Sequence, residues 1–152
     1  MAGKKRASRF KQGIFRPVHP EKYRGKGKPV YRSSYELKLH RWCDHNPKVL
    51  RWGSESIVIP YSNPLKQGAT SRYFVDYFIE IDLGDKQTKK FLVEVKPYSQ
   101  TIPPKSPKRL TKAHGMRLAE WARNQAKWTA ARAWAARKNM EFVLVTEKEL
   151  GL

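Results

Sequence analysis

The chain contains one cysteine, few acids and no long apolar run. Of its 152 residues only Cys43 carries a thiol, which excludes an internal disulfide and a zinc site built from cysteines. No apolar stretch approaches the roughly 20 residues of a transmembrane helix. No apolar segment follows the basic N-terminal residues either, so we expect no signal peptide, no membrane partner and a location in the cytoplasm.

Positive charge is what the chain has in excess. Its 32 lysines and arginines face 13 aspartates and glutamates, which gives a formal net charge of +19. Solubility needs far less, and such an excess usually meets a polyanion, of which nucleic acid is the commonest. Charge alone leaves a membrane-surface or ribosomal protein as the alternative.

The cations are concentrated in two segments. Residues 1–32 are basic and interrupted by proline and glycine, so we expect an extended N-terminal arm, followed by one domain over 33–152. A second basic segment, rich in proline and lysine, spans 98–112. Cations of both segments are predicted to hold double-stranded DNA by its phosphates: Lys4, Lys5, Arg6, Arg9, Lys11, Arg24, Lys26, Lys28, Lys105, Lys108, Arg109 and Lys112.

The hydrophobic pattern predicts an α/β domain with a mixed β-sheet flanked by helices. The expected helices cover 33–46 and 114–139, with a short turn or helix after 146. The expected strands cover 48–52, 56–61, 71–82, 89–97 and 140–146. On the long helix we expect one mostly apolar, buried stripe, made of Leu118, Trp121, Ala122, Gln125, Trp128 and Thr129.

The two longest strands are expected to pair as an antiparallel hairpin. Folding about a turn near Asp85, without a bulge, sets Tyr77 opposite Val93 and makes one apolar face. The same register sets Glu80 opposite Lys90 as a pair of opposite charges.

Three charged side chains share the other face of this hairpin. Asp76 faces Glu94 with Cβ atoms roughly 4.5–5.5 Å apart, and Lys96 points to the same side. Two half-buried carboxylates in this position need a shared proton or a cation, and hard oxygen ligands of this kind suit Mg²⁺. The alternative is a solvent-facing strand, on which single acids and acid–lysine pairs two residues apart are common.

An acid on an early helix, an aspartate on a strand and Glu-Val-Lys on the next strand together resemble the PD-(D/E)XK nuclease superfamily. Here the pieces are Glu36, Val75-Asp76 and Glu94-Val95-Lys96, with Val75 in place of the proline that usually precedes the aspartate. The stretches RYFVDYFIE and FLVEVKP are similar to the endonuclease subunit of heteromeric bacterial transposases. The overall size and the basic arm resemble the head-completion nucleases of T-even-like tailed phages.

The resemblance implies a PD-(D/E)XK nuclease-like core and a role for each matched residue. Asp76 and Glu94 would hold Mg²⁺, for which Mn²⁺ would substitute, with the Val95 carbonyl as a further ligand. Lys96 would orient the attacking water.

Two further side chains have a competing structural role. Glu36 would complete the metal environment, directly or through water, but it equally fits a capping box with Ser33. Gln125 interrupts the stripe of the long helix, at a place where several branches of the superfamily carry a glutamine with a catalytic role. A buried glutamine satisfied by backbone groups is the alternative.

The resemblance as a whole implies a Mg²⁺-dependent deoxyribonuclease, acting as an endonuclease or also an exonuclease. No module for reading bases is recognisable, so we expect little sequence specificity. The phage resemblance implies cleavage before head–tail joining, in the host bacterial cytoplasm or on the virion, beside head, portal or neck proteins. Two alternatives stay open: a non-enzymatic DNA-binding head protein, and a Holliday-junction-type resolvase on the same fold. The sequence gives no oligomeric state.

Overall fold

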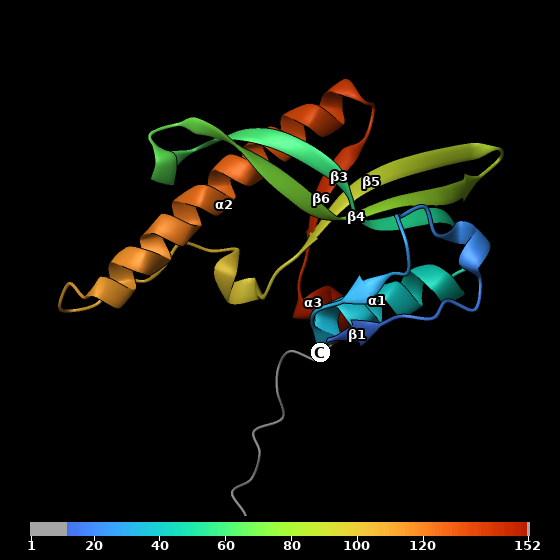
Figure 1. The fold of residues 1–152 in the computed structure, drawn as a ribbon, viewed down its shortest axis with the longest axis horizontal. Coiled ribbons are helices and arrows are strands. Elements are labelled where there is room, and N and C mark those ends of the chain that lie inside the picture. The colour runs from blue at the N-terminus through green and yellow to red at the C-terminus, as the bar shows by residue number, and fades with distance from the viewer. Residues whose placement is uncertain (1–11, 152) are drawn as a thin grey trace, which may run out of the picture.

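A computed structural model describes residues 12–151 and builds them around a four-stranded sheet with a helix on each face (Figure 1). The main elements are α1 (Ser34–His45), β3 (Val49–Asn63), β4 (Ala69–Gly84), β5 (Gln87–Val95), α2 (Lys112–Arg137), β6 (Glu141–Val145) and α3 (Glu147–Leu150). A two-stranded ribbon, β1 (Gly13–Ile14) with β2 (Val30–Tyr31), precedes them, and short 3₁₀ turns occur at Pro20–Lys22, Pro64–Lys66 and Tyr98–Gln100.

The sheet is mixed, as the sequence predicts. Its order is β3-β4-β5-β6, with antiparallel pairing from β3 to β5 and parallel pairing between β5 and β6. Parallel neighbours need a crossover, and α2 provides it between β5 and β6. None of the helices in the described part of the chain is long and apolar enough to cross a membrane.

Each face of the sheet has its own apolar core. On one face, Leu39 and Cys43 of α1 pack against Trp52, Ile79 and Val93. On the other face, Trp128, Ala131 and Ala135 of α2 pack against Ile59, Tyr61, Tyr73, Val75 and Leu92. The outer ends of β3 and β4 (green) accordingly curve over α2 (orange) in Figure 1.

The predicted register of the β4–β5 hairpin is confirmed. Tyr77 pairs with Val93, and Glu80 pairs with Lys90. The turn at Asp85 and Lys86 has positive φ at both residues (53° and 63°), which matches the twist of a tight hairpin. The charge partner of Glu80 differs from the prediction, because its buried carboxylate pairs with Arg51 of β3 at 2.7 Å.

The two short strands predicted over 48–52 and 56–61 are wrong as separate elements, since β3 is continuous from Val49 to Asn63. The segment between them looks like a turn because it contains Gly53. In the structure it is a bulge, where the pairing with β4 shifts between Ser54 and Ile57 and Glu55 has a φ of 52°. A bulge bends a strand without ending it, and this one lets β3 curve over α2.

Residues 12–32 pack onto the domain. Phe15 is buried, with its ring edge-on to His40 at 5.3 Å between centroids. The buried Asp44 carboxylate of α1 accepts the backbone N–H groups of Val18 and His19, both at 2.8 Å. The described part of the arm predicted over 1–32 is therefore packed against the domain. Residues 1–11 lie outside the described residues. The boundary at residue 32 stays a prediction.

The predicted stripe on the long helix is confirmed at Trp128, which is buried, and is wrong at three other positions. The buried residues of α2 are His114, Asn124, Trp128, Ala131 and Ala135, whereas Leu118, Ala122 and Thr129 are exposed. Both sets fit a helical period, and the alanine-rich face is buried because the tightly curved sheet lies close to it.

Candidate active site

The candidate site lies where β4 and β5 part. Their ladder ends at Tyr77 and Val93, after which β5 continues beside β6 as far as Val95. The next positions on the two strands are Asp76 and Glu94, so the two predicted carboxylates flank this fork. The Val95 N–H, which no longer pairs with β4, donates to Asp76 Oδ2 at 2.8 Å.

Each carboxylate oxygen of Glu94 contacts a neighbouring side chain. Its side chain is only 6% exposed. The Tyr73 hydroxyl donates to Glu94 Oε2 at 2.5 Å, and Lys96 Nζ lies 3.5 Å from Oε1. The Lys96 backbone N–H donates to the Val145 carbonyl at 3.0 Å, which fixes the lysine at the end of β5. The structure thus brings Asp76, Glu94 and Lys96 together as predicted.

Burial and two neighbouring carboxylates disfavour the ionisation of Asp76. Burial raises the pKa of Asp76 well above its ordinary value, and the charges of Glu94 and Glu36 raise it further. The Val95 N–H and the Lys96 ammonium act in the opposite direction but do not cancel this effect. A carboxylate in such surroundings is stabilised by a proton or by an added cation.

Glu36 stands in the first turn of α1 and contributes charge to the same region. Burial raises the pKa of Glu36, and the charges of Glu55 and Glu94 raise it too. Its backbone N–H donates to Ser33 Oγ at 3.1 Å, and its Oε2 accepts the N–H of Arg32 at 2.8 Å. The cap is therefore present, although the carboxylate reaches Arg32 rather than the N–H of Ser33.

The residues at the fork fit a hard divalent cation in part. Across residues 12–151, no three His, Cys, Asp or Glu side chains gather closely enough to hold a metal by themselves. Glu36 therefore does not join Asp76 and Glu94 as a ready-made third ligand. Two carboxylates suffice for Mg²⁺, which keeps several of its waters in proteins. The burial of Asp76 beside the charge of Glu94 is the feature that favours a cation here.

Helix α2 adds cations that sequence reasoning missed. Lys127 Nζ lies over the rings of Tyr73 and Tyr61, at 5.5 and 5.9 Å from their centroids. Burial lowers the pKa of Lys127, and the positive charges of Arg123 and Lys96 lower it further. The sequence signal was present, because Arg123 and Lys127 are four residues apart and share a helix face.

Gln125 is not brought into the fork by any contact of the described residues. It is half-buried and makes no side-chain hydrogen bond within 12–151. The buried polar side chain in this part of α2 is Asn124, one position earlier and about 100° round the helix. The catalytic role of Gln125 stays a prediction.

The cations predicted to contact DNA are exposed wherever the structure describes them. Arg24, Lys26 and Lys28 are exposed in the segment that crosses β3 near Trp52. The exposed cations before and at the start of α2 are Lys105, Lys108, Arg109 and Lys112. The predicted contacts Lys4, Lys5, Arg6, Arg9 and Lys11 lie outside the described residues.

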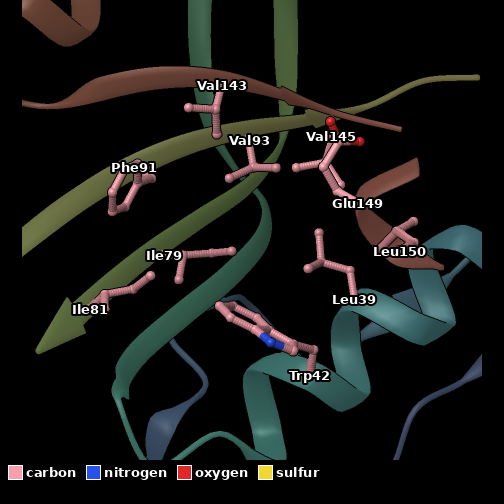
Figure 2. Close-up of a pocket in the computed structure, with 10 residues that line it drawn as sticks. All are labelled: Leu39, Trp42, Ile79, Ile81, Phe91, Val93, Val143, Val145, Glu149 and Leu150. Atoms are coloured by element: carbon pink, nitrogen blue, oxygen red, sulfur yellow. The ribbon is translucent and has the colours of Figure 1, made fainter. Parts of the chain in front are cut away.

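A separate apolar groove lies on the opposite face of the sheet. It has a volume of about 320 Å³. Figure 2 shows Leu39 and Trp42 of α1 on one side of it, facing Ile79, Phe91 and Val93 of the sheet. None of the acids at the fork lines this groove, so it is not part of the candidate site.

Comparison with known proteins agrees with this geometry. The family described as TnsA-like endonuclease N terminal matches residues 46–147, which include β3 to β6 and α2 but not α1. The head completion nuclease of Enterobacteria phage T4 is 36% identical over 143 residues, covering 91% of this chain and 92% of that protein. The mixed sheet flanked by helices fits the PD-(D/E)XK-like fold expected from the sequence. The chain therefore belongs to the TnsA-like endonuclease family.

Proposed function

We propose that this protein is a metal-dependent deoxyribonuclease that cleaves DNA with little sequence specificity during phage head completion. The observation that carries the proposal is the pair Asp76 and Glu94 at the fork, where burial and the charge of Glu94 raise the pKa of Asp76. Family membership and the similarity to a phage head completion nuclease support the same reading. Both endonucleolytic and exonucleolytic cleavage are compatible with such a site.

Asp76 and Glu94 would hold Mg²⁺, or Mn²⁺ in its place, with the Val95 carbonyl as a further oxygen ligand. Such an ion, when bound, lowers the pKa of a coordinated water and stabilises charge on the phosphate. Glu36 would act from the second layer by its charge, since its Oε2 already accepts the Arg32 N–H. The Val95 N–H keeps Asp76 oriented by binding Oδ2, which leaves Oδ1 for the cation.

Lys96 would position the attacking water. Its ammonium lies 3.5 Å from Glu94 Oε1. A small movement of the lysine side chain would replace this contact by one to a water or to a phosphate oxygen. Lys127 and Arg123 would stabilise the phosphate charge from the side of α2. Burial lowers the pKa of Lys127, and the positive charges of Arg123 and Lys96 lower it further, which favours an anion beside it.

The exposed cations of the N-terminal segment and of 105–112 would hold the duplex by its phosphates. Phosphate contacts carry no sequence information, so specificity should be weak and affinity should fall steeply with salt. The host bacterial cytoplasm or the virion, and a head, portal or neck protein as a partner, follow from the phage relative by analogy.

The test is cleavage of a supercoiled plasmid and of a four-way junction, each with Mg²⁺, Mn²⁺ or EDTA. We expect nicking and linearisation of the plasmid with either metal and none with EDTA. Retention of both DNAs without cleavage at any metal concentration would favour a non-enzymatic DNA-binding protein. Cleavage of the junction alone would favour a resolvase on the same fold.

A further inference from the structure

A second cavity, of about 490 Å³, lies between the segment that follows Lys96 and the first half of α2. Gln100 and Ile102 belong to the first wall, and Glu120, Trp121 and Asn124 belong to the second. The first wall begins at Ser99, in the short 3₁₀ turn that follows Lys96 and the end of β5. The wall residue Glu120 has a lowered pKa, mainly through its hydrogen bond to Arg123, and the Lys96 charge contributes to the lowering.

Asn124 is the unusual member of this wall. It is 2% exposed, and its Oδ1 has no hydrogen-bond partner among the described residues. Buried amides are nearly always paired, and an unpaired one needs an explanation. On the same helix face the next buried residues are Trp128, Ala131 and Ala135, so an apolar residue at 124 would suit the packing. The amide thus indicates a polar ligand that enters the cavity.

The lining combines an aromatic ring, an aliphatic side chain and amide groups. Trp121 and Ile102 supply apolar surface, and Asn124 and Gln100 supply hydrogen-bond donors and acceptors. A nucleobase has this chemistry, with two apolar faces and a polar edge, and aromatic side chains bind bases by stacking. Arg117 at the wall is exposed and supplies positive charge for a neighbouring phosphate.

We propose that this cavity binds one unstacked nucleobase of the strand being cut, next to the scissile phosphate, with Trp121 stacking on it and Asn124 bonding its edge. The proposal rests on the nuclease function proposed above. A base inside a duplex is not accessible to such a pocket, so the nucleotide has to be unpaired or flipped. DNA with frayed or single-stranded nucleotides beside the cut should therefore be the preferred substrate.

The test is a binding measurement, which does not depend on cleavage. Catalytically inactive Asp76→Asn protein is titrated against two labelled single strands of equal length, one of thymidines and one with abasic sites, followed by fluorescence anisotropy. We expect the strand with bases to bind about tenfold more tightly, as for one stacked base. Trp121→Ala and Asn124→Ala, each added to that background, should reduce this ratio toward one. Leu118→Ala, on the exposed face of the same helix, should leave it unchanged.

A second measurement keeps the proposal testable if a variant folds poorly. In ¹⁵N-labelled protein with Asp76→Asn alone, thymidine dinucleotide should shift the side-chain amide resonances of Asn124, and an abasic dinucleotide should not. Equal affinity for the two strands, or equal shifts with the two dinucleotides, would overturn the base pocket. A base preference in a protein that never cleaves plasmid would keep the pocket and remove the nuclease proposal, so the two failures are distinguishable.

Discussion

Asp76 and Val95 are joined across the end of the β4–β5 ladder by a hydrogen bond of 2.8 Å from the Val95 N–H to the Asp76 carboxylate. Backbone pairing between β4 and β5 ends at Tyr77 and Val93, and this hydrogen bond links the strands at the next positions. It also holds one oxygen of a carboxylate whose pKa is raised by burial and by the charges of Glu94 and Glu36. An orienting contact on a destabilised charge is what a cation-binding aspartate requires.

Replacing Asp76 by asparagine should stabilise the metal-free protein. The folded-state pKa of Asp76 lies above its unfolded value, so its ionisation costs folding free energy once the pH exceeds both. The amide removes that cost and still accepts the Val95 N–H. At pH 8 with EDTA we expect the free energy of unfolding to rise by about 1 kcal/mol or more, which is about 2–4 °C in Tm.

The matched control is Asp85→Asn, which removes the same charge from the β4–β5 turn and should leave Tm nearly unchanged. At pH 3.5 the gain of Asp76→Asn should disappear, because the wild-type carboxyl is then protonated in both states. A decrease of Tm for Asp76→Asn at pH 8, beside an unchanged Asp85→Asn, would contradict the raised pKa of Asp76.

Glu36 should influence metal binding by its charge rather than as a ligand. Protons compete with a cation for Asp76, so the affinity for Mn²⁺ should rise with pH over the range in which the carboxyls at the fork ionise. Glu36→Gln removes one of the charges that raise the pKa of Asp76. Calorimetric titrations across pH should place the midpoint of this rise at lower pH in Glu36→Gln than in wild type.

At pH 8 the same variant should lose only about threefold to tenfold in affinity, as expected for one nearby charge in a partly solvated site. Glu141→Gln, at the exposed first residue of β6, serves as the control. Complete loss of Mn²⁺ binding in Glu36→Gln would instead make Glu36 a direct ligand.

Lys127 should contribute to cleavage, although from the sequence it is interpreted as a cation of the helix surface. Its amine lies over the ring of Tyr73, the residue that donates to Glu94. Burial lowers the pKa of Lys127, and the charges of Arg123 and Lys96 lower it further. Lys127→Met should lower the single-turnover rate of plasmid nicking by about tenfold or more, the usual effect of removing one donor to a transition state.

Lys138→Met is the matched control, because Lys138 also lies over an aromatic ring, Trp134, at the distant end of α2. It should leave the rate constant unchanged at low salt. An equal loss in both variants would mean that the helix binds DNA only by its overall charge.

His40 should make the protein sensitive to acid. It is fully buried, its Nδ1 contacts the Tyr77 hydroxyl and its Nε2 contacts the Val30 carbonyl, and burial lowers its pKa to about 4. The unfolded state binds this proton from about pH 6.5 downward and the folded state does not. Stability should therefore be lost as the pH falls from 6.5 to 4, by about 3 kcal/mol in total from this residue.

The raised pKa values of Asp76 and Glu36 act in the opposite direction, so the His40 effect is best isolated by comparison. The difference in unfolding free energy between wild type and His40→Gln should narrow between pH 7 and pH 4.5. Parallel stability curves for wild type and His40→Gln would disprove the lowered pKa of His40.

The sequence predicted the hairpin of the site well because the signal was local. A turn at Asp85 fixes the register of β4 and β5, and the register places Asp76 beside Glu94 without further information. The capping residue Ser33 and the start of α1 were predictable for the same reason.

Other features depend on packing that no local pattern encodes. Two faces of α2 that share Trp128 have a helical period, and the packing against the curved sheet decides that Asn124 and Ala131 are buried instead of Leu118. That choice also orients Lys127 toward the fork and Asn124 into the cavity. The bulge at Glu55 produces the curvature of β3. Its sequence, which begins with Gly53, predicts a turn between two strands instead.

If Asp76 and Glu94 together hold the cation with which the protein cuts DNA, removing either carboxylate should abolish cleavage. The measurement is nicking of supercoiled plasmid in Mg²⁺ and Mn²⁺ by wild type, Asp76→Asn, Glu94→Gln and the control Asp85→Asn, at equal protein concentration and confirmed folding. We expect cleavage by wild type and Asp85→Asn with either metal, and a loss of about a hundredfold or more in the other two. Equal nicking by all four proteins would contradict this expectation.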